Sequence, residues 1–327
     1  MDFLLTAFLG KPLWMWAAFL LVVAALLAFD LGVLHRKKQE IGVRESLKLS
    51  AFYIAVGLAY GGWIWWSLGS GAGLDYLTGF VVEKSLALDN VFVIATIFGY
   101  FAVPRQYQHR VLFWGILGVI VLRAVMIGVG AALVTRFEWV LYLFAAFLVF
   151  TGIKMLVRPP GDYSVGDQPV LAFARRKLRV TEGFEGGRFL VRRVSPETGR
   201  VALQATPLFL ALVLIEFADV VFAVDSVPAI FAITTDPFIV YTSNIFAVLG
   251  LRALYFAVAA MIHRFHYLKY ALAVLLVFIG SKVFVAGALD IEKFPPLVSL
   301  GATFAILGAG IAYSLHRTRR DARLAAG

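Results

Sequence analysis

The chain alternates between long apolar stretches and short polar segments along its whole length. Each stretch is close to the roughly 20 apolar residues that a helix needs to cross the hydrocarbon core of a bilayer. This pattern predicts an all-α membrane protein with about nine transmembrane helices. The nine stretches are 12–34, 47–68, 78–101, 110–134, 137–157, 206–232, 240–262, 267–288 and 296–316.

The composition agrees with a chain that lies mostly in the membrane. It has 327 residues, of which 61% are hydrophobic and 15% charged, with a mean hydropathy of +0.86, whereas soluble proteins are roughly 45–50% apolar. Nine spans leave no room for a large soluble enzyme domain, so we do not expect an enzyme. The absence of cysteine excludes disulfides, thiolate catalysis and soft-metal thiolate sites.

The formal net charge of +10 would ordinarily raise the question of nucleic-acid binding. In membrane proteins, however, Lys and Arg collect in the cytoplasmic loops. If the N-terminus lies outside, the outer segments hold only Lys11, Arg136 and Lys293 among the 30 basic residues. We therefore expect a multi-pass protein of the cell inner (plasma) membrane, with its N-terminus outside, its C-terminus in the cytoplasm and no nucleic-acid partner.

The largest segment outside the predicted spans covers residues 158–205. Two short alternating runs flank the turn-like residues 195–199 and predict a small cytoplasmic hairpin. The segment is either a linker that lies against anionic headgroups or a regulatory or partner-docking element. The glycine-rich residues 69–73, which lack phosphate-loop spacing, are expected to form a flexible outer loop.

An internal repeat relates two groups of three consecutive spans. Residues 82–94 align with 218–230, and this places Glu83 opposite Asp219, and Asp89 opposite Asp225. The agreement continues in Leu122-Arg123-Ala124 with Leu251-Arg252-Ala253, and in residues 148–154 with 276–282. Because three spans separate the copies, the second copy enters the membrane from the opposite side. The sequence therefore predicts an inverted repeat, whose two acidic helices should meet near the midplane.

The repeat also predicts how the chain is organised. An N-terminal two-helix segment precedes the first copy, the cytoplasmic linker and hairpin separate the copies, and a last span with a basic tail follows the second copy. The corresponding residues are 1–77, 78–157 for repeat 1, 158–205, 206–288 for repeat 2, and 289–327.

Six carboxylates fall inside predicted spans, where a charge costs several kcal/mol unless it is paired or hydrated. Such residues are candidates for function, although buried pairing with Arg123, Arg252 or nearby lysines would give them a purely structural role. A spacing of six residues on a helix separates two side chains by about 120° and ~9 Å, so a regular helix would not bring all the acids to one ion. The six are Asp30, Glu83, Asp89, Glu216, Asp219 and Asp225.

Asn90 and Ser226 add neutral oxygens at matching positions of the repeat. We therefore take Asp30, Glu83, Asp89, Asn90, Glu216, Asp219, Asp225 and Ser226 as candidate metal ligands. Oxygen ligands suit hard or borderline cations such as Mn²⁺, Mg²⁺ and Ca²⁺, whereas copper and zinc prefer nitrogen and sulfur. Asp30 lies near the inner end of its span, where hydration alone could support it. Lys84 and the two arginines are expected to be counter-ions of the empty site.

Two long motifs, residues 82–90 and 216–233, resemble those of the TerC family of bacterial integral membrane proteins, including its Alx branch. The resemblance covers most of the chain and carries over the acids Glu83, Asp89, Glu216, Asp219 and Asp225. It implies tellurium resistance or manganese export under metal or alkaline stress. Six carboxylates in the membrane would repel the tellurite oxyanion. Ala218 stands where threonine is common in the family, so a hydroxyl ligand is lost there.

We therefore expect a transporter that exports a divalent cation, with Mn²⁺ as substrate and no tightly bound cofactor. The outward direction comes from the resemblance alone. The expected partners are the metal ion and membrane lipid, and a homo-oligomer remains open. The alternative is a membrane scaffold that supports metal loading or insertion of secreted proteins, with residues 158–205 as its working surface. On that interpretation tellurite resistance is an indirect phenotype.

Overall fold

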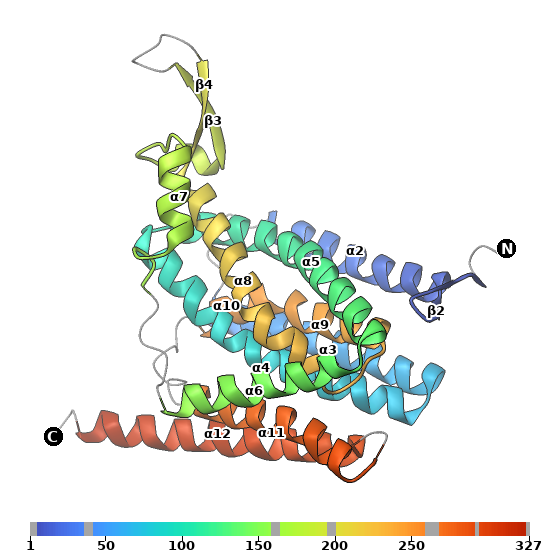
Figure 1. Ribbon diagram of the computed structural model, residues 1–327. Helices are drawn as coiled ribbons and strands as arrows, with labels where there is room; N and C mark the ends of the chain where they lie inside the picture. The colour runs from blue at the N-terminus through green and yellow to red at the C-terminus, as the bar shows by residue number, and fades with distance from the viewer. Residues whose placement is uncertain are drawn as a thin grey trace.

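The computed structural model describes residues 5–35, 42–157, 164–194, 201–258, 268–291 and 294–324. Long helices dominate it, and the two termini lie at opposite ends of the helices (Figure 1). The helices are α2 (Leu13–His35), α3 (Val43–Leu68), α4 (Ser70–Tyr100), α5 (Arg105–Arg136), α6 (Trp139–Val157), α7 (Pro169–Lys177), α8 (Pro207–Phe231), α9 (Pro237–Leu249), α10 (Leu251–Val258), α11 (Leu268–Ala288) and α12 (Pro296–Leu324).

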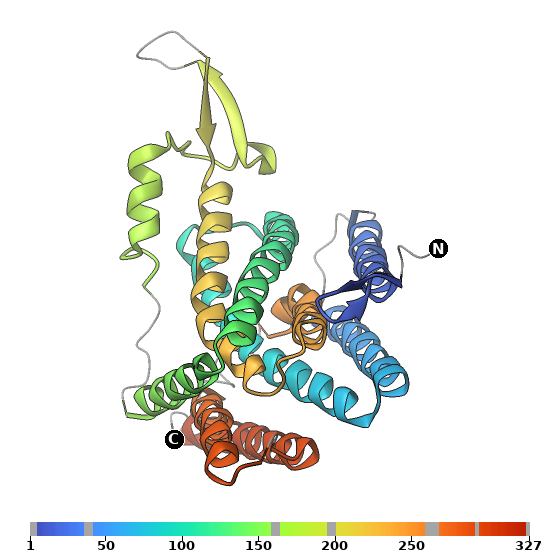
Figure 2. The ribbon, with the colours of Figure 1, turned by 45° about the vertical axis from the view of Figure 1, so that its right-hand side comes forward.

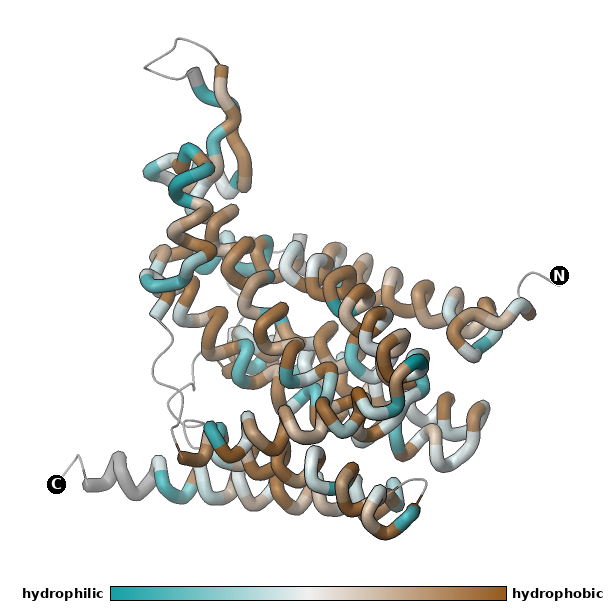
Figure 3. The backbone as a smooth tube through the Cα atoms, viewed as in Figure 1, coloured by the Kyte–Doolittle hydropathy of each residue, from teal (hydrophilic) through white to brown (hydrophobic). Residues whose placement is uncertain are grey.

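Seven of the described helices are long and apolar enough to cross a membrane, or eight if the bent pair α9 and α10 forms one span. Hydrophobic residues follow these helices, and hydrophilic ones gather around α7 and the helix ends (Figure 3). The chain is thus a multi-pass integral membrane protein. The remaining predicted span corresponds to α4, which has 31 residues but carries Asp75, Glu83, Lys84 and Asp89. The count of nine spans stays a prediction.

The predicted flexible loop at residues 69–73 is wrong, because α4 begins at Ser70. Gly69 alone separates α3 from α4 and adopts φ +93°, a conformation that glycine reaches without steric cost. Gly73 then lets the two helices touch, since a Cβ atom there would lie 2.9 Å from the Cα of Trp65. A glycine-rich sequence permits a tight helical corner as readily as a loop.

The predicted span at 240–262 is interrupted within the residues that the structure describes. Helix α9 ends at Leu249, α10 starts at Leu251, and the two axes differ by 41°. A Cβ atom at Gly250 would lie 2.9 Å from Lys84 Nζ and 3.0 Å from Tyr53 Cβ, so the break packs closely against α3 and α4. Residues 259–262 lie outside the described part of the chain.

The hairpin predicted in the 158–205 segment forms. Strands β3 (Leu190–Val194) and β4 (Val201–Ala205) pair antiparallel, with Leu190 opposite Ala205 and Arg192 opposite Leu203; the turn residues 195–200 lie outside the described ranges. The hairpin and α7 run across the direction of α11 and α12 in both views (Figures 1 and 2). Its cytoplasmic location stays a prediction. A shorter hairpin near the N-terminus pairs β1 (Ala7–Phe8) with β2 (Lys11–Pro12).

The crossing of α6 and α11 is reciprocal. A Cβ atom at Gly152 would lie 2.7 Å from the carbonyl oxygen of Ala273, and one at Gly280 would lie 2.6 Å from that of Ala145. Gly152 and Gly280 are equivalent positions in the internal repeat, and so are Ala145 and Ala273. Small residues at such crossings allow two membrane helices to approach until their backbones touch.

Candidate cation site

The two acidic helices α4 and α8 pack against each other, as the repeat predicts. Helix α8 continues through Pro228 to Phe231, so the six-residue spacing of its acids is kept on a regular helix. Asp219 and Asp225 accordingly face different surroundings. The first is buried beside Arg123 of α5, and the second is half-buried and faces a cavity.

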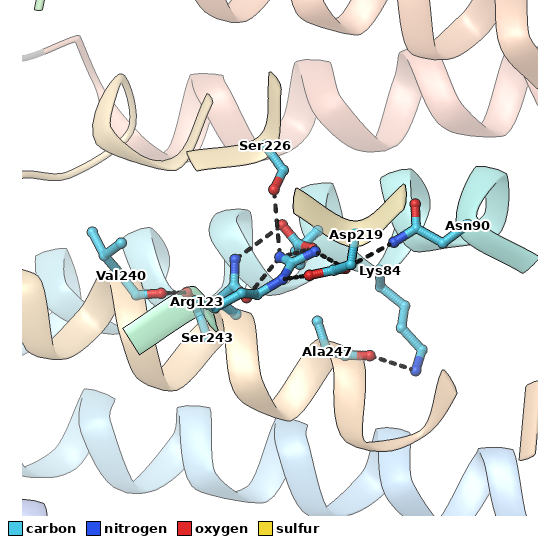
Figure 4. Close-up of polar contacts among 10 residues, drawn as sticks. Lys84, Asn90, Arg123, Asp219, Ser226, Val240, Ser243 and Ala247 are labelled. Atoms are coloured by element: carbon cyan, nitrogen blue, oxygen red, sulfur yellow. Dashed lines mark hydrogen bonds and ion pairs between the residues drawn. The ribbon is translucent and has the colours of Figure 1, made fainter. Parts of the chain in front are cut away.

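Arg123 is the centre of a buried polar network (Figure 4). Its Nη2 and Nε donate to the two carboxylate oxygens of Asp219 at 3.0 and 3.3 Å, and its Nη1 forms an ion pair with Glu83. Nη1 also reaches the side-chain oxygen of Asn244 at 2.7 Å and the hydroxyl of Ser226 at 3.4 Å. One guanidinium therefore joins four helices, α4, α5, α8 and α9.

Two amides complete the network. Asn244 donates from Nδ2 to the second oxygen of Glu83 at 3.1 Å, and Asn90 donates to Asp219 at 3.5 Å. Arg123 is 1% exposed, Glu83 and Asn244 are 0% exposed, and two carboxylates face one guanidinium. With both acids ionised, the network carries one negative charge. Removal of the guanidinium would leave two buried carboxylates without their cation, and such a loss costs about 3–5 kcal/mol.

A cavity of about 470 Å³ lies against this network, between α4, α6, α8 and α11. Side chains with oxygen atoms from three helices line it. Arg123 and Lys154 also reach its wall, so the lining carries both signs of charge. The oxygen-bearing residues are Glu83, Asp89, Asn90, Thr151, Asp225 and Ser226.

Two acids in the cavity lining, Asp89 and Asp225, are not bonded to Arg123 and have other neighbours. Asp225 accepts a hydrogen bond from the Thr151 hydroxyl and lies in the field of Lys154, both on α6. Asp89 lies in the field of Lys269 on α11. Both carboxylates are half-buried, whereas Glu83 and Asp219 are buried. The cavity therefore offers two carboxylates whose oxygens the guanidinium does not occupy.

Three predicted ligands, Asp30, Glu216 and Asp219, are not among the residues that line the cavity. Asp219 is held by Arg123, as described above. Asp30 on α2 forms an ion pair with Arg252 of α10, and its backbone oxygen accepts a second hydrogen bond from the same guanidinium at 3.3 Å. Glu216 on α8 lies against Gly118 of α5. Its Oε2 atom is buried and makes no hydrogen bond within the described structure.

Within the described residues Lys84 forms no ion pair with an acid, contrary to the expectation of a counter-ion. Its ammonium donates to the carbonyl oxygen of Ala247 at 2.9 Å, in the last turn of α9 (Figure 4). The C-terminal end of a helix carries partial negative charge, so a buried cation is stabilised there. The break at Gly250 supplies this position.

Sequence reasoning did not select Asn244 or Thr151. Asn244 is a fully buried amide in an apolar span, which is itself a signal of function or of specific pairing. Thr151 lies in the repeated segment 148–154 and faces Asp225. In the part of the chain that the structure describes, no three His, Cys, Asp or Glu side chains converge as a metal-binding group.

Comparisons with known proteins show which family the sequence resembles over most of its length. The model of the Integral membrane protein TerC family matches residues 68–322. "Uncharacterized membrane protein STKORF319" of Myxococcus xanthus is 45% identical over 310 residues, which are 95% of this chain and 94% of that protein. A protein of Escherichia coli K12 named as a proposed membrane-bound redox modulator, Alx, is 46% identical over 307 residues, 91% of this chain and 92% of its own.

An "Uncharacterized membrane protein" of Rickettsia bellii is 44% identical over 302 residues, which are 92% of this chain and 97% of that protein. No solved structure matches the chain significantly. The resemblance noted in the two acidic motifs extends over most of the sequence, and it includes the helices that build the Arg123 network and the cavity. The chain therefore belongs to the TerC family of integral membrane proteins.

Proposed function

We propose that this protein exports a divalent metal cation, with Mn²⁺ as its substrate, through the cavity between α4, α6, α8 and α11. One observation carries the proposal: Asp89, Asp225 and Thr151 face the same cavity as Glu83, Asn90 and Ser226. Carboxylate, amide and hydroxyl oxygens suit Mn²⁺. With six oxygen-bearing residues in its lining, the cavity has enough potential ligands for an octahedral ion.

The reciprocal contact of α6 and α11 supports an inverted repeat. Equivalent glycines meet equivalent alanines across one crossing, as a two-fold axis in the membrane plane would require. Transporters built from such repeats hold the substrate between the copies and open it alternately to the two sides. The cavity lies between helices of both copies, so the proposed site has the expected position.

We place the N-terminus outside and the C-terminus in the cytoplasm of the inner membrane. The opposite positions of the two termini (Figure 1) fit this arrangement. The excess of Lys and Arg in the predicted cytoplasmic segments indicates which terminus lies in the cytoplasm. Export rather than uptake follows from the family resemblance. We also propose that the protein is not an enzyme and holds no tightly bound cofactor.

The name of the Escherichia coli relative refers to redox modulation. This chain has no cysteine, so it cannot exchange thiols and disulfides with a partner. On our proposal, an influence on cellular redox state would act through the amount of Mn²⁺ that the cell retains. Redox modulation and manganese export are then two descriptions of one activity.

The direct test is Mn²⁺ flux by the purified protein in liposomes, reported by a trapped dye, with and without a pH gradient. We expect flux that depends on protein and that the gradient accelerates, because exchange with protons is the available energy source. Asp225→Asn serves as the matched inactive control, since it keeps the size of the side chain and removes one charge from the cavity. Absence of Mn²⁺ flux in folded protein would refute the proposal.

A membrane scaffold is the second candidate, favoured by the hairpin that projects from the helices (Figure 2). Its exposed side chains include Val201 at 67% and Leu203 at 60% exposure, an apolar surface suited to a partner. Replacing residues 164–203 by a short linker separates the two functions. A transporter should keep metal flux, whereas a scaffold should lose its effect on secreted proteins.

A further inference from the structure

We propose that Arg123 is an internal cation that competes with the substrate for Glu83 and Asp219, and that this competition excludes monovalent ions from the site. The inference rests on the proposed function and specifies its selectivity. All three guanidinium nitrogens donate to network side chains, and Asp219 receives two of these bonds. Three predicted ligands, Glu83, Asp219 and Ser226, are therefore already bound to a cation within the protein.

The position of Arg123 makes the competition direct. Its side chain lines the cavity together with Glu83, Asn90 and Ser226, so an ion that enters meets the guanidinium at the wall. While Arg123 holds both acids, an incoming ion has Asp89 and Asp225 as its charged ligands. Displacement of the guanidinium would add Glu83 and free the side-chain oxygen of Asn244, which now accepts from Arg123. The cavity provides adjacent space for a displaced side chain.

The charges of the network decide which ions can displace the guanidinium. Arginine stays protonated in proteins, and its paired hydrogen bonds to one carboxylate are among the strong ones. A monovalent ion would replace one unit charge by another and lose those paired bonds. A divalent ion carries one more positive charge than the guanidinium. Its stronger attraction to the two carboxylates can offset the loss of the guanidinium hydrogen bonds. The network thus favours divalent ions by charge as well as by ligand type.

Arg252 is the matched comparison within the same chain. It occupies the equivalent position in the second copy of the repeat, is 4% exposed and forms an ion pair with Asp30. It does not contribute to the cavity lining. Replacement of Arg252 therefore tests the loss of a buried arginine without removing a competitor from the cavity.

The test measures equilibrium Mn²⁺ binding to the purified full-length chain, with free Mn²⁺ quantified by its electron paramagnetic resonance signal. Binding is compared in two buffers of equal ionic strength, one containing K⁺ and the other a bulky organic cation. Wild type should bind Mn²⁺ equally in both media. Arg123→Gln should bind at least about tenfold more tightly in the organic cation, because the ligand charge is no longer neutralised in part. K⁺ should now weaken that binding, while folded Arg252→Gln should bind Mn²⁺ equally in both media, as wild type does.

Arg123→Lys provides a second test that leaves a cation beside both carboxylates. A lysine is a point charge without the planar pair of donors, so the same changes should occur to a smaller extent. Unchanged Mn²⁺ affinity and continued indifference to K⁺ in either folded variant would overturn the inference. Wild-type protein that neither binds nor transports Mn²⁺ would instead refute the proposed function.

Discussion

Gly152 on α6 and Gly280 on α11 make equivalent contacts with each other's helix. Gly152 lies against the carbonyl oxygen of Ala273, and Gly280 lies against that of Ala145. Each alanine stands seven residues before the glycine of its own helix. Any other residue would place a Cβ atom within 2.7 Å of a backbone oxygen, so the two helices would have to shift apart. The contact fixes the distance between α6 and α11, and hence the width of the cavity that these helices border.

This relationship predicts that Gly152→Ala and Gly280→Ala destabilise the protein to a similar extent. Forcing a methyl group into a tight contact costs about 1–3 kcal/mol. Thermal unfolding in detergent, followed by the loss of the monodisperse species, measures the effect. Gly128→Ala is the control, since a Cβ atom at Gly128 meets nothing within 4 Å. A large effect at only one of the two glycines would contradict the reciprocal geometry.

Asp89→Asn and Asp225→Asn should abolish most Mn²⁺ flux without preventing membrane insertion. Each variant keeps the side-chain size but removes a charge from the cavity, and divalent affinity depends on the charge of the ligands. The measurement is Mn²⁺ flux per membrane-inserted molecule. Asp167→Asn is the control, because it removes the charge of an exposed aspartate outside the cavity. Normal flux in either cavity variant would remove that residue from the site.

The Asp30 and Arg252 pair distinguishes a structural carboxylate from a ligand. Arg252→Gln alone should lower stability by about 3–5 kcal/mol, because it leaves a buried carboxylate without its cation. Asp30→Asn combined with Arg252→Gln should recover much of that stability. If Asp30 only neutralises Arg252, the double variant also has wild-type Mn²⁺ flux per folded molecule. A stable double variant that remains inactive would assign Asp30 to the transport pathway.

Topology can be tested with single cysteines, because the native chain contains none. Gly166→Cys should be shielded from an impermeant thiol reagent in intact cells, whereas Leu289→Cys should react. Leu289 is 64% exposed at the end of α11 and makes a better probe than Asp236. Asp236 caps α9 and forms an ion pair with Lys11 at 2.9 Å. Labelling of Gly166→Cys from outside would reverse the proposed orientation.

The hairpin should lie against an anionic lipid surface. Leu190, Arg192, Val201 and Leu203 share one of its faces, a mixture of apolar and basic side chains that suits the headgroup region. An environment-sensitive fluorophore on Leu203→Cys should shift to the blue in nanodiscs with phosphatidylglycerol. The same fluorophore on Ala202→Cys, on the opposite face, should shift less. Equal spectra at both positions would rule out this orientation.

The sequence predicts that α4 and α8 pack against each other. Both apolar spans carry acids at the same spacing, and such acids are stable in a membrane only where they face other polar groups within the protein. It does not predict the partner of each acid. Arg123 contacts Asp219 across 96 residues of sequence, and Asn244 contacts Glu83 across 161. These contacts depend on how four helices rotate and approach, which periodicity within one helix does not encode. The corner at Gly69 was missed for a related reason, since its helical form depends on contact with Trp65.

The interrupted span formed by α9 and α10 has a mechanical consequence. Lys84 fastens the end of α9 to α4, whereas Arg252 fastens the start of α10 to Asp30 on α2. The two arms of this joint are therefore attached to different helices, with Gly250 between them. Any sliding of α2 relative to α4 would change the angle at Gly250, and the joint would transmit that movement to Asn244, which touches both Arg123 and Glu83.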